Sequence, residues 1–494
     1  MSLNRREFLR TSTAAAALGP VTGALTASQA TAGDDADHRR PNLLFILADQ
    51  WRGSALGVGS DEVVRTPHID RLTEQGTNFT RAYAANPVCT PNRSCLLTGR
   101  YSHQTGMITN NLMLPPEEVC WPELFRDAGY ATHYIGKWHM DGNSKPGFVP
   151  PGWRRRGFET FEGFNRGHIY HRPWGFDNDG GPLIAKRKDD GSPYYEPTFQ
   201  TDLAIDYMRQ HQDRPFACYL SWGPPHTPFK PPQDFDRYTP GDIRLRKNVP
   251  QEHQQKARRD LAGYYGLCES LDHEMGRLLT FLDESGLADN TLLVFTADHG
   301  ELAGSHGKYR KGEPEDESLR VPLVMRLPGT IPAGQSSQTL VNSIDLMPTM
   351  LHMCGIETPE TCVGRNLSTA ATGQGPQPSV ESIYCEGKVN GVAGRRRQQA
   401  SDGPDTTGAW RTLVTDRYKL TVRHGEENVV QLFDLHNDPF EMGNHANAPS
   451  HRAVQKELLA ELHRWAQETG DSWPDRPRAA KAMYSNREAE RARG

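Results

Sequence analysis

Two pairs of adjacent residues in this sequence carry side chains that bind hard divalent cations. Asp49-Gln50 and Asp298-His299 each follow a continuous apolar run, the pattern of strands that are buried on both faces. Ligands of open α/β sheets bind outside the carboxyl ends of the strands, so both pairs are expected at one edge of a sheet. Two carboxylates, an amide oxygen and an imidazole suit Ca²⁺, Mg²⁺ or Mn²⁺. One such Asp alone would more often cap a turn, but two pairs on similar strands favour a metal site.

Cys89 lies in a segment with the features of a helix start, Cys89-Thr90-Pro91-Asn92-Arg93. Thr90 is predicted to cap the helix and Pro91 to take its first position. A thiol at this place lies near the positive end of the helix dipole, which favours a thiolate or a bound phosphate or sulfate. For such a cysteine alone, a buried structural role would be the more common explanation.

Lys137 and His139 form a second candidate pair. They are two residues apart on a predicted strand, so their side chains are expected on one face while Trp138 points to the other. Without other motifs, the ordinary interpretation would be a lysine at a strand edge and a histidine in the core.

The elements that must position these residues alternate along the chain between strands and helices. This alternation predicts an α/β domain with a large, mainly parallel (mixed) sheet sandwiched by helices. The predicted strands are Asn42–Ala48, Thr132–Trp138, Pro215–Trp222 and Thr291–Ala297, and helices are predicted from Thr66-Pro67 and over Gln251–Gly286.

After Leu351 the pattern changes to short β-like runs followed by a helix. This predicts a smaller C-terminal antiparallel sheet plus helix, and we place the main domain at residues 33–375 and this subdomain at 376–494. The polar, arginine-rich segment Gly394–Gly408 is predicted to be a loop. The predicted strands are Ser382–Cys385, Arg411–Val414, Lys419–Val422 and Val429–Phe433, and the helix is Ala453–Glu468.

The N-terminus has the pattern of an export signal. Asn4-Arg5-Arg6-Glu7-Phe8-Leu9-Arg10 matches a twin-arginine motif, an alanine-rich stretch follows, and Ala30-Thr31-Ala32 fits a cleavage site. We predict a twin-arginine signal peptide over residues 1–32, which implies a periplasmic or extracellular protein. An uncleaved anchor or an amphipathic tail is the alternative.

Composition excludes several classes of protein. The net charge of −5 gives no support for nucleic-acid binding, and no apolar run beyond the N-terminus approaches a membrane span. None of the eight cysteines forms a C-x-x-C pair, which argues against a zinc ribbon. Cys354 and Cys362 are close enough in sequence for a disulfide, although spacing alone does not establish pairing.

The order of these motifs resembles that of the type I sulfatases of the alkaline phosphatase superfamily. The resemblance covers about residues 41 to 445, and its most specific part is Cys-x-Pro-x-Arg running into Leu-Leu-Thr-Gly-Arg at residues 89–100. The other matching motifs are Pro41 to Gln50, Thr66 to Asp70, Gly136 to His139, Thr296 to Gly300, Glu317 to Pro322, Asp345 to Thr349, Leu432 to Leu435 and Asp438-Pro439.

The resemblance implies a chemical role for Cys89. In the family a maturation enzyme oxidises this cysteine to formylglycine, whose hydrate bears two hydroxyl groups. One hydroxyl attacks sulfur and forms a covalent sulfo-enzyme, and the second then loses its proton, expels sulfate and restores the aldehyde. A divalent metal, most often Ca²⁺, is implied at Asp49, Gln50, Cys89, Asp298 and His299.

The resemblance also assigns roles to the basic residues. Arg93 is expected to brace the formylglycine, Lys137 to bind a sulfate oxygen, and His139 to act as a base near the formylglycine hydroxyl. His226 matches the histidine that helps to protonate the leaving alcohol. Lys311, seven residues before Ser318, matches a second sulfate-binding lysine, although Lys308 is close by. Together such cations stabilise charge that develops on the transferred group.

One residue departs from the commonest family pattern. Many members have Asp-Asp after the first strand, where this chain has Asp49-Gln50. Asp-Gln also occurs in choline sulfatases and in phosphonate monoester hydrolases of the same superfamily. Choline or aryl sulfates, and phosphonate monoesters or phosphodiesters, therefore remain alternative substrates.

A segment rich in arginine, histidine and aromatic residues follows the Lys137 motif. Aromatic rings stack on sugars, and arginine pairs with carboxylate or sulfate, so we predict a sulfated glycan or sugar sulfate as the substrate. A surface loop packed by its own aromatic residues is the plainer explanation. The candidate substrate residues are Arg166, His168, Tyr170 and His171.

Overall fold

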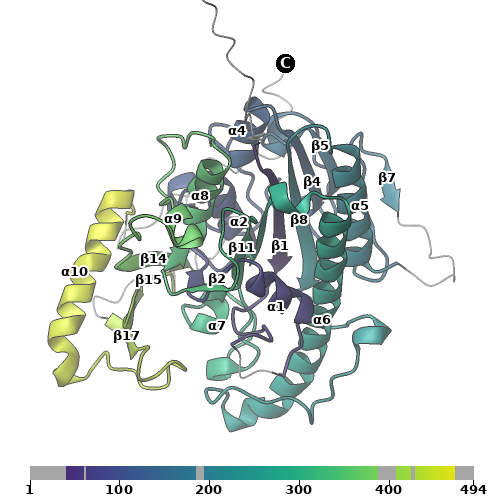
Figure 1. Ribbon diagram of the computed structural model, residues 1–494. Coiled ribbons are helices and arrows are strands. Elements are labelled where there is room, and N and C mark those ends of the chain that lie inside the picture. The colour runs from purple at the N-terminus through teal and green to yellow at the C-terminus, as the bar shows by residue number, and fades with distance from the viewer. Residues whose placement is uncertain (1–39, 60–62, 185–193, 388–407, 424–428, 473–494) are drawn as a thin grey trace, which may run out of the picture. The chain divides into compact units, whose positions relative to one another are not determined.

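The computed structural model describes residues 40–59, 63–184, 194–387, 408–423 and 429–472 (Figure 1). The predicted signal peptide and nearly all of the loop predicted at Gly394–Gly408 lie outside these residues, so both stay predictions. No helix in the described ranges is both long enough and apolar enough to cross a membrane.

A ten-stranded sheet forms the centre of the described structure, in the order β12-β2-β11-β9-β1-β8-β4-β5-β6-β7. The strands β9, β1, β8, β4 and β5 are parallel, and antiparallel pairs flank them, so the predicted mainly parallel, mixed sheet is confirmed. The bounds are β1 Asn42–Asp49, β2 Thr77–Phe79, β4 Ala131–Lys137, β5 Thr160–Phe164, β6 Trp174–Phe176, β7 Pro182–Ile184, β8 Phe216–Pro225, β9 Thr291–Ala297, β11 Leu323–Arg326 and β12 Gln335–Ser337.

Helices cover both faces of this sheet, which explains why every residue of β1 is buried. Successive residues of β4 show the two faces. His133 stacks on Tyr207 of α5, while Tyr134 packs against Tyr219, which in turn stacks on Trp121 of α4. The helices are α1 Pro67–Glu74, α2 Cys89–Thr98, α3 Ser102–Thr105, α4 Trp121–Asp127, α5 Glu196–Gln210, α6 Gln254–Glu284, α7 Asp316–Leu319, α8 Leu346–Met353 and α9 Ser368–Thr372.

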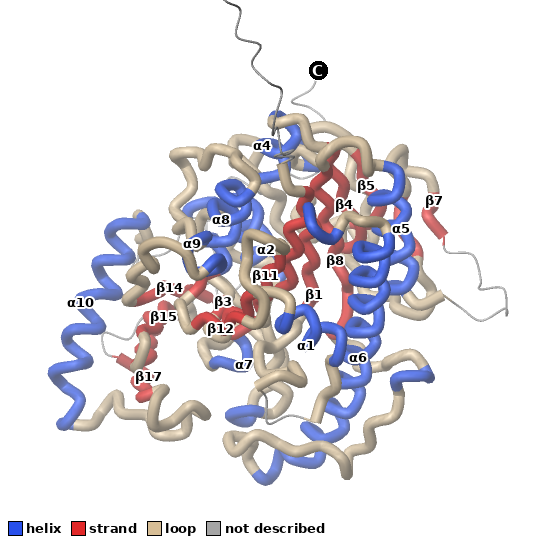
Figure 2. The backbone as a smooth tube through the Cα atoms, viewed as in Figure 1, coloured by secondary structure: helices blue, strands red, loops and turns tan. Residues whose placement is uncertain are grey.

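A separate antiparallel sheet in the order β14-β15-β16-β17 packs against helix α10, as predicted (Figure 2). Its elements are β14 Ser382–Gly387, β15 Trp410–Thr415, β16 Tyr418–Arg423, β17 Val429–Asp434 and α10 Arg452–Thr469. A three-stranded sheet that was not predicted is formed by β3 Ala82–Tyr83, β10 Arg320–Val321 and β13 Val341–Asn342.

The structure corrects the predicted start of α2. The helix begins at Cys89 itself, and Val88 is the residue that precedes it, so Pro91 does not take the first position. Thr90 does not cap the helix, because its hydroxyl donates to the carbonyl oxygen of His139 at 2.7 Å. The disulfide considered between Cys354 and Cys362 is not formed, and both thiols are free.

Candidate active site

The two predicted ligand pairs lie together at the carboxyl edge of the large sheet. Asp49 ends β1, and Asp298 directly follows β9, whose last residue is in register with Ala48. The backbone N–H of Gln50 donates to Asp298 Oδ1 at 3.0 Å, and that of Asp298 donates to the Ala48 carbonyl oxygen at 3.2 Å. Parallel pairing of β1 and β9 therefore places both carboxylates in one buried position.

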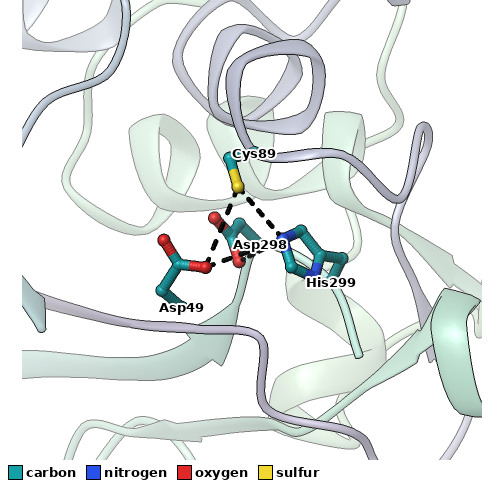
Figure 3. A group of neighbouring side chains, drawn as sticks. All are labelled: Asp49, Cys89, Asp298 and His299. Carbon is teal, nitrogen blue, oxygen red and sulfur yellow. Dashed lines mark hydrogen bonds and ion pairs between the residues drawn. The ribbon is translucent and has the colours of Figure 1, made fainter. Parts of the chain in front are cut away.

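Cys89 is the first residue of helix α2, and its sulfur points toward Asp49, Asp298 and His299 (Figure 3). Its Sγ atom lies 3.3 Å from His299 Nε2 and 3.9 Å from Asp49 Oδ1. One ligand atom each of Asp49, Cys89, Asp298 and His299 lies within 4.8 Å of all the others, and all four residues are buried. Two carboxylates with an imidazole and a further ligand fit a divalent cation.

Gln50 is oriented toward this group by a residue that the sequence did not indicate. Its Nε2 donates to Glu301 Oε2 at 2.6 Å, so its Oε1 faces Lys311, whose Nζ donates to it at 3.0 Å. The φ angle of Gln50 is 72°, a left-handed conformation that turns the chain directly after the strand. Glu301 lies three residues after Asp298, but nothing in this spacing distinguished it from a turn residue.

Arg93 is buried between the two aspartates rather than against Cys89. Its Nη2 lies 3.2 Å from Asp49 Oδ2, and its Nε lies 3.0 Å from Asp298 Oδ2. A third donor, Nη1, binds the Lys137 carbonyl oxygen and Ser221 Oγ. Arg93 thus fixes both carboxylates, no contact of the described residues joins it to the Cys89 thiol, and its expected role toward formylglycine stays a prediction.

Two lysines lie at the site, and Lys311 rather than Lys308 is one of them. Lys311 Nζ donates to Cys89 Sγ at 3.0 Å, whereas Lys308 pairs with Glu315 at 2.7 Å outside the site. Lys137 Nζ donates to Asp49 Oδ2 at 2.5 Å. In this structure Lys137 pairs with a carboxylate that would also face a cation, and the charge of Lys311 acts on the same carboxylate.

The electrostatics of the site favour an anion at position 89. Burial and the charge of Asp49 raise the pKa of the Cys89 thiol, but Lys137, Lys311 and His299 outweigh them and lower this pKa to about 7. Burial also opposes ionisation of Asp49, and the neighbouring cations, with Lys137 first, still hold its pKa well below the usual range. The Sγ atom occupies the place of the hydroxyl oxygens that a hydrated formylglycine would present.

His139 lies near the site but not on the strand, which corrects the expectation of a shared face with Lys137. Strand β4 ends at Lys137, and His139 has a left-handed φ of 61°. Its side chain is buried, and its Nδ1 has no hydrogen-bond partner among the described residues. Burial, then the charges of Lys137 and Arg93, lower the pKa of this imidazole well below its ordinary value.

His226 and His168 form a stacked pair above Lys137. Their ring centroids are 3.9 Å apart and their planes differ by 2°. Lys137 Nζ lies 3.2 Å from His168 Nε2, and the hydroxyl of Tyr170 donates to the His226 carbonyl oxygen at 2.6 Å. Burial and the charge of Lys311 lower the pKa of His226 well below its ordinary value.

The four candidate substrate residues separate into two groups. His168 and Tyr170 are part of the site through the contacts just described, and Arg166 lies close enough for its charge to act on His139. His171 instead is exposed and hydrogen-bonds to the carbonyl oxygen of Lys230 at 3.0 Å. Its ring also lies 5.8 Å from that of Tyr195, and no hydrogen bond or ring contact of the described residues joins it directly to Lys137 or His226.

A family model described as Sulfatase matches residues 41–356, and a second, N-sulphoglucosamine sulphohydrolase C-terminal, matches residues 304–468. This chain belongs to the sulfatase family. It is a hydrolase of sulfate esters. An ulvan-active sulfatase of Formosa agariphila is 34% identical over 88% of this chain and 83% of its own length. An N-acetylglucosamine-6-O-sulfatase of Bacteroides thetaiotaomicron is 24% identical over 88% of each chain.

Solved structures show the same fold as this sulfatase. A structure of the putative sulfatase yidJ from Bacteroides fragilis has a TM-score of 0.78 and 28% identity, covering 90% of this chain and 98% of its own. A phosphonate monoester hydrolase of Agrobacterium radiobacter has a TM-score of 0.71 and 23% identity, covering 87% and 96%. The second likeness concerns the fold alone.

Proposed function

We propose that this sulfatase removes sulfate from a sulfated carbohydrate through a formylglycine formed from Cys89. The observation that carries the proposal is the position of Cys89 at the start of α2, with Asp49, Asp298, His299 and Lys311 around its Sγ atom. A maturation enzyme oxidises the thiol to the aldehyde, and water hydrates the aldehyde. Cysteine or serine could attack once but could not release the sulfate in the same way, because neither has a second hydroxyl.

In the proposed reaction one hydroxyl oxygen of the hydrate attacks sulfur, and the bond from sulfur to the sugar oxygen breaks. The sugar oxygen leaves as an alcohol after it receives a proton. The second hydroxyl then gives its proton to a base, the C=O bond forms, and sulfate leaves with the bonding electrons of its C–O bond. Water rehydrates the aldehyde, so the net change is hydrolysis of one ester.

Asp49, Gln50, Asp298, His299 and the residue at 89 would hold a divalent metal. Oxygen ligands predominate in this set, which favours Ca²⁺, with Mg²⁺ or Mn²⁺ as the other candidates. When bound, the cation lowers the pKa of a coordinated hydroxyl and offsets charge on the sulfate. The donor set fits because Glu301 and Arg93 already orient Gln50 and both carboxylates.

The basic residues around the site would act on the transferred group. Lys137 and Lys311 point toward the site and can each move from a carboxylate or amide oxygen to a sulfate oxygen. His226 would protonate the leaving oxygen. Burial and the charge of Lys311 disfavour its imidazolium form, and the negative charge of a bound sulfate ester would favour it. His139, with an unpartnered Nδ1, is the candidate base for the second hydroxyl.

A sulfated carbohydrate is the proposed substrate class. The relatives named above act on ulvan and on a sulfated N-acetylglucosamine by their descriptions. In this chain His168, Tyr170 and Arg166 gather beside the predicted sulfate position, as a polar glycan site requires. With a twin-arginine signal over residues 1–32, the enzyme would act in the periplasm or outside the cell.

Hydrolysis of phosphonate monoesters or phosphodiesters is the second candidate function. Gln50 in place of a second aspartate, and the fold shared with a phosphonate monoester hydrolase, are the observations that favour it. The same nucleophile could attack phosphorus. The preference for sulfate or phosphorus esters must therefore depend on the charge of the site and on its contacts with the substrate. Choline or aryl sulfates are the alternatives within the sulfatases.

The test is a rate comparison on protein produced with a maturation enzyme and supplied with Ca²⁺. The panel contains sulfated monosaccharides and oligosaccharides, an aryl sulfate, choline sulfate, a phosphonate monoester and a phosphodiester. The proposal predicts the highest kcat/KM on a sulfated saccharide. Faster turnover of the phosphorus esters would replace it with the second candidate, and preference for choline or aryl sulfate would reject the carbohydrate.

A further inference from the structure

Arg166 lies at the edge of the site on the segment that follows β5. Strand β5 pairs with β4 so that Phe164 is opposite Lys137, and the N–H of His139 donates to the carbonyl oxygen of Asn165 at 2.5 Å. Arg166 is therefore next to His139, two residues beyond the end of its strand, and is half-buried. This places Arg166 beside His139, a candidate active-site residue, and its charge acts on that imidazole.

Two asparagines hold this guanidinium in place. Arg166 Nη1 donates to Oδ1 of Asn111 and, at 2.6 Å, to Oδ1 of Asn143. The neighbouring Asn110 accepts the backbone N–H of Thr90 at 3.0 Å, so the loop that holds Arg166 also contacts the start of the nucleophile's helix. These bonds therefore hold the guanidinium beside the loop that contacts the helix of Cys89.

The charge of Arg166 has no anionic partner within the described part of the chain. No carboxylate there forms an ion pair with it, and its Nε and Nη2 donate no hydrogen bond to a described residue. Arg154, in the short 3-10 helix η1 (Trp153–Arg155), shows the usual alternative, since it binds both oxygens of Asp141. Amide oxygens orient a guanidinium but do not neutralise it, and they leave the Nε and Nη2 side available.

We propose that Arg166 binds a second anionic group of the substrate, adjacent to the sulfate that is cleaved. This inference rests on the proposed function and narrows the substrate to saccharides with two oxyanions, either a uronate carboxylate or a second sulfate. The free pair of donors matches the two oxygens of a carboxylate or of a sulfate, which arginine binds in a bidentate manner.

Binding measurements with matched ligands test this role. Cys89→Ala prevents turnover, and in this background Arg166 is compared with Arg166→Met and Arg166→Lys. The ligands are sulfated disaccharides that contain a uronic acid, the same disaccharides after reduction of the carboxylate to an alcohol, and disaccharides with one or two sulfates. Arg172→Met is the matched control, because Arg172 is exposed in the same segment.

Arg166→Met is expected to weaken binding of the dianionic ligands about 10- to 100-fold, as for a lost charged hydrogen bond. The affinity for the monoanionic ligands should change less than about threefold. Arg166→Lys should keep part of the preference for dianionic over monoanionic ligands, and Arg172→Met should keep all of it. A loss of affinity for the uronate ligands identifies a carboxylate as the bound group, and a loss of affinity for the disulfated ligands identifies a second sulfate.

Two results would overturn the inference. One is an equal loss for dianionic and monoanionic ligands, which would make Arg166 a structural residue. The other is a protein with Arg166 intact that binds both ligand classes equally or binds neither. Failure of the proposed function is separate, because it would appear as absent sulfate-ester turnover by mature enzyme, while these affinities would still report on Arg166.

Discussion

The side chain at position 89 is surrounded by charges of both signs, and the cations outweigh the anions. Lys311 contacts it directly, His299 lies 3.3 Å from its sulfur, and the charge of Lys137, which pairs with Asp49, also acts on it. This arrangement lowers the pKa of the thiol to about 7 and would equally stabilise an oxyanion at the same position. At the residue scale, the site is built for negative charge on its nucleophile and on its substrate.

His168 is predicted to position Lys137 and His226 for any sulfate ester. It accepts a hydrogen bond from Lys137 Nζ at 3.2 Å and stacks on His226 at 3.9 Å. We expect His168→Ala to lower kcat/KM about 10- to 100-fold on all sulfate esters, small aryl sulfates included. The reason is that Lys137 loses a hydrogen bond and His226 loses its stacked ring. Steady-state kinetics on an aryl sulfate and on a saccharide sulfate measure this.

His168→Gln, which keeps an acceptor for Lys137 but not the stacked ring, should recover part of the loss. His171→Ala is the control from the same segment, since that residue is exposed and its ring binds Lys230 rather than Lys137 or His226, and it should stay within about twofold of the unchanged enzyme. An His168→Ala variant with unchanged kinetics on the aryl sulfate would rule out the positioning role.

Several site residues followed from the sequence because their positions depend on strand ends. Asp49 and Asp298 end or follow buried apolar strands, and parallel pairing makes them neighbours. The partners of Arg93 and the contact between Gln50 and Glu301 could not be predicted, because they depend on side-chain geometry across residues far apart in sequence. The left-handed φ of His139 was missed for a related reason, since the strand pattern does not mark the last paired residue.

At the scale of elements, the small sheet supports the loop that carries Lys311. The indole N–H of Trp410 in β15 donates to the Gly312 carbonyl oxygen at 3.0 Å, and Lys419 Nζ in β16 donates to that of Pro314 at 2.8 Å. Both side chains are buried. The C-terminal sheet thus helps to place a residue of the active site although it lies outside the large sheet.

Trp410→Phe is predicted to reduce kcat about 3- to 10-fold, because the lost hydrogen bond allows the Lys311 loop to shift. Trp465→Phe is a matched control, since its indole N–H binds Ser382 Oγ at 2.8 Å on the α10 side of the sheet. Measuring both kcat and Tm for the two variants separates a shift of the Lys311 loop from a general loss of stability. Equal losses of kcat in the two variants would show that general stability, not the loop, is responsible.

Helices α3 and α10 are joined to β14 by an ionic cluster around His103. Its Nδ1 lies 3.2 Å from Glu386 Oε2 and its Nε2 lies 3.3 Å from the Thr469 carbonyl oxygen, so both ring nitrogens face acceptors. Burial lowers the pKa of His103, but Glu386 and then Asp471 outweigh it and raise this pKa above its ordinary value. The protonated ring therefore stabilises the fold.

Because this pKa is raised on folding, the stabilisation is complete below about pH 6.5, the pKa of an unfolded histidine, and is lost as pH rises through the folded value. We expect His103→Gln to lower the free energy of unfolding by about 1–2 kcal/mol at pH 6 and by less at pH 9. Chemical denaturation at the two pH values measures this difference. His463→Gln, at an exposed position of α10, is the control, and a pH-independent loss in His103→Gln would refute the prediction.

The strands of the small sheet and helix α10 were predicted to within one or two residues at each end, because they are regular and separated by turns. The short strands β2, β3, β10, β12 and β13 were not predicted. Each has only two or three residues, and their pairing depends on partners far apart in the chain rather than on local pattern.

At the scale of the whole molecule, the proposed metal site joins the ends of two central strands to the start of α2. The predicted boundary near residue 375 separates this part from the C-terminal subdomain and stays a prediction. Since the ligands come from segments that meet only in the folded chain, metal binding should stabilise the fold as a whole.

Adding Ca²⁺ to chelator-treated protein is predicted to stabilise it by about 2.7 kcal/mol at a concentration of 100 times Kd, with a matching rise in Tm. Asp298→Asn should abolish most of this rise, whereas Asp213→Asn, at an exposed position, should not. Thermal unfolding with Ca²⁺, Mg²⁺ and Mn²⁺ in turn ranks the ions. Equal stabilisation of Asp298→Asn and the unchanged protein would place the cation elsewhere.

The most direct test of the central claim is the mass of the peptide that contains Cys89, taken from mature protein made together with a maturation enzyme. Conversion to formylglycine predicts a peptide about 18 Da lighter than its cysteine form, in proportion to the sulfatase activity of the preparation. An unmodified thiol in protein that hydrolyses sulfate esters would contradict the proposed nucleophile.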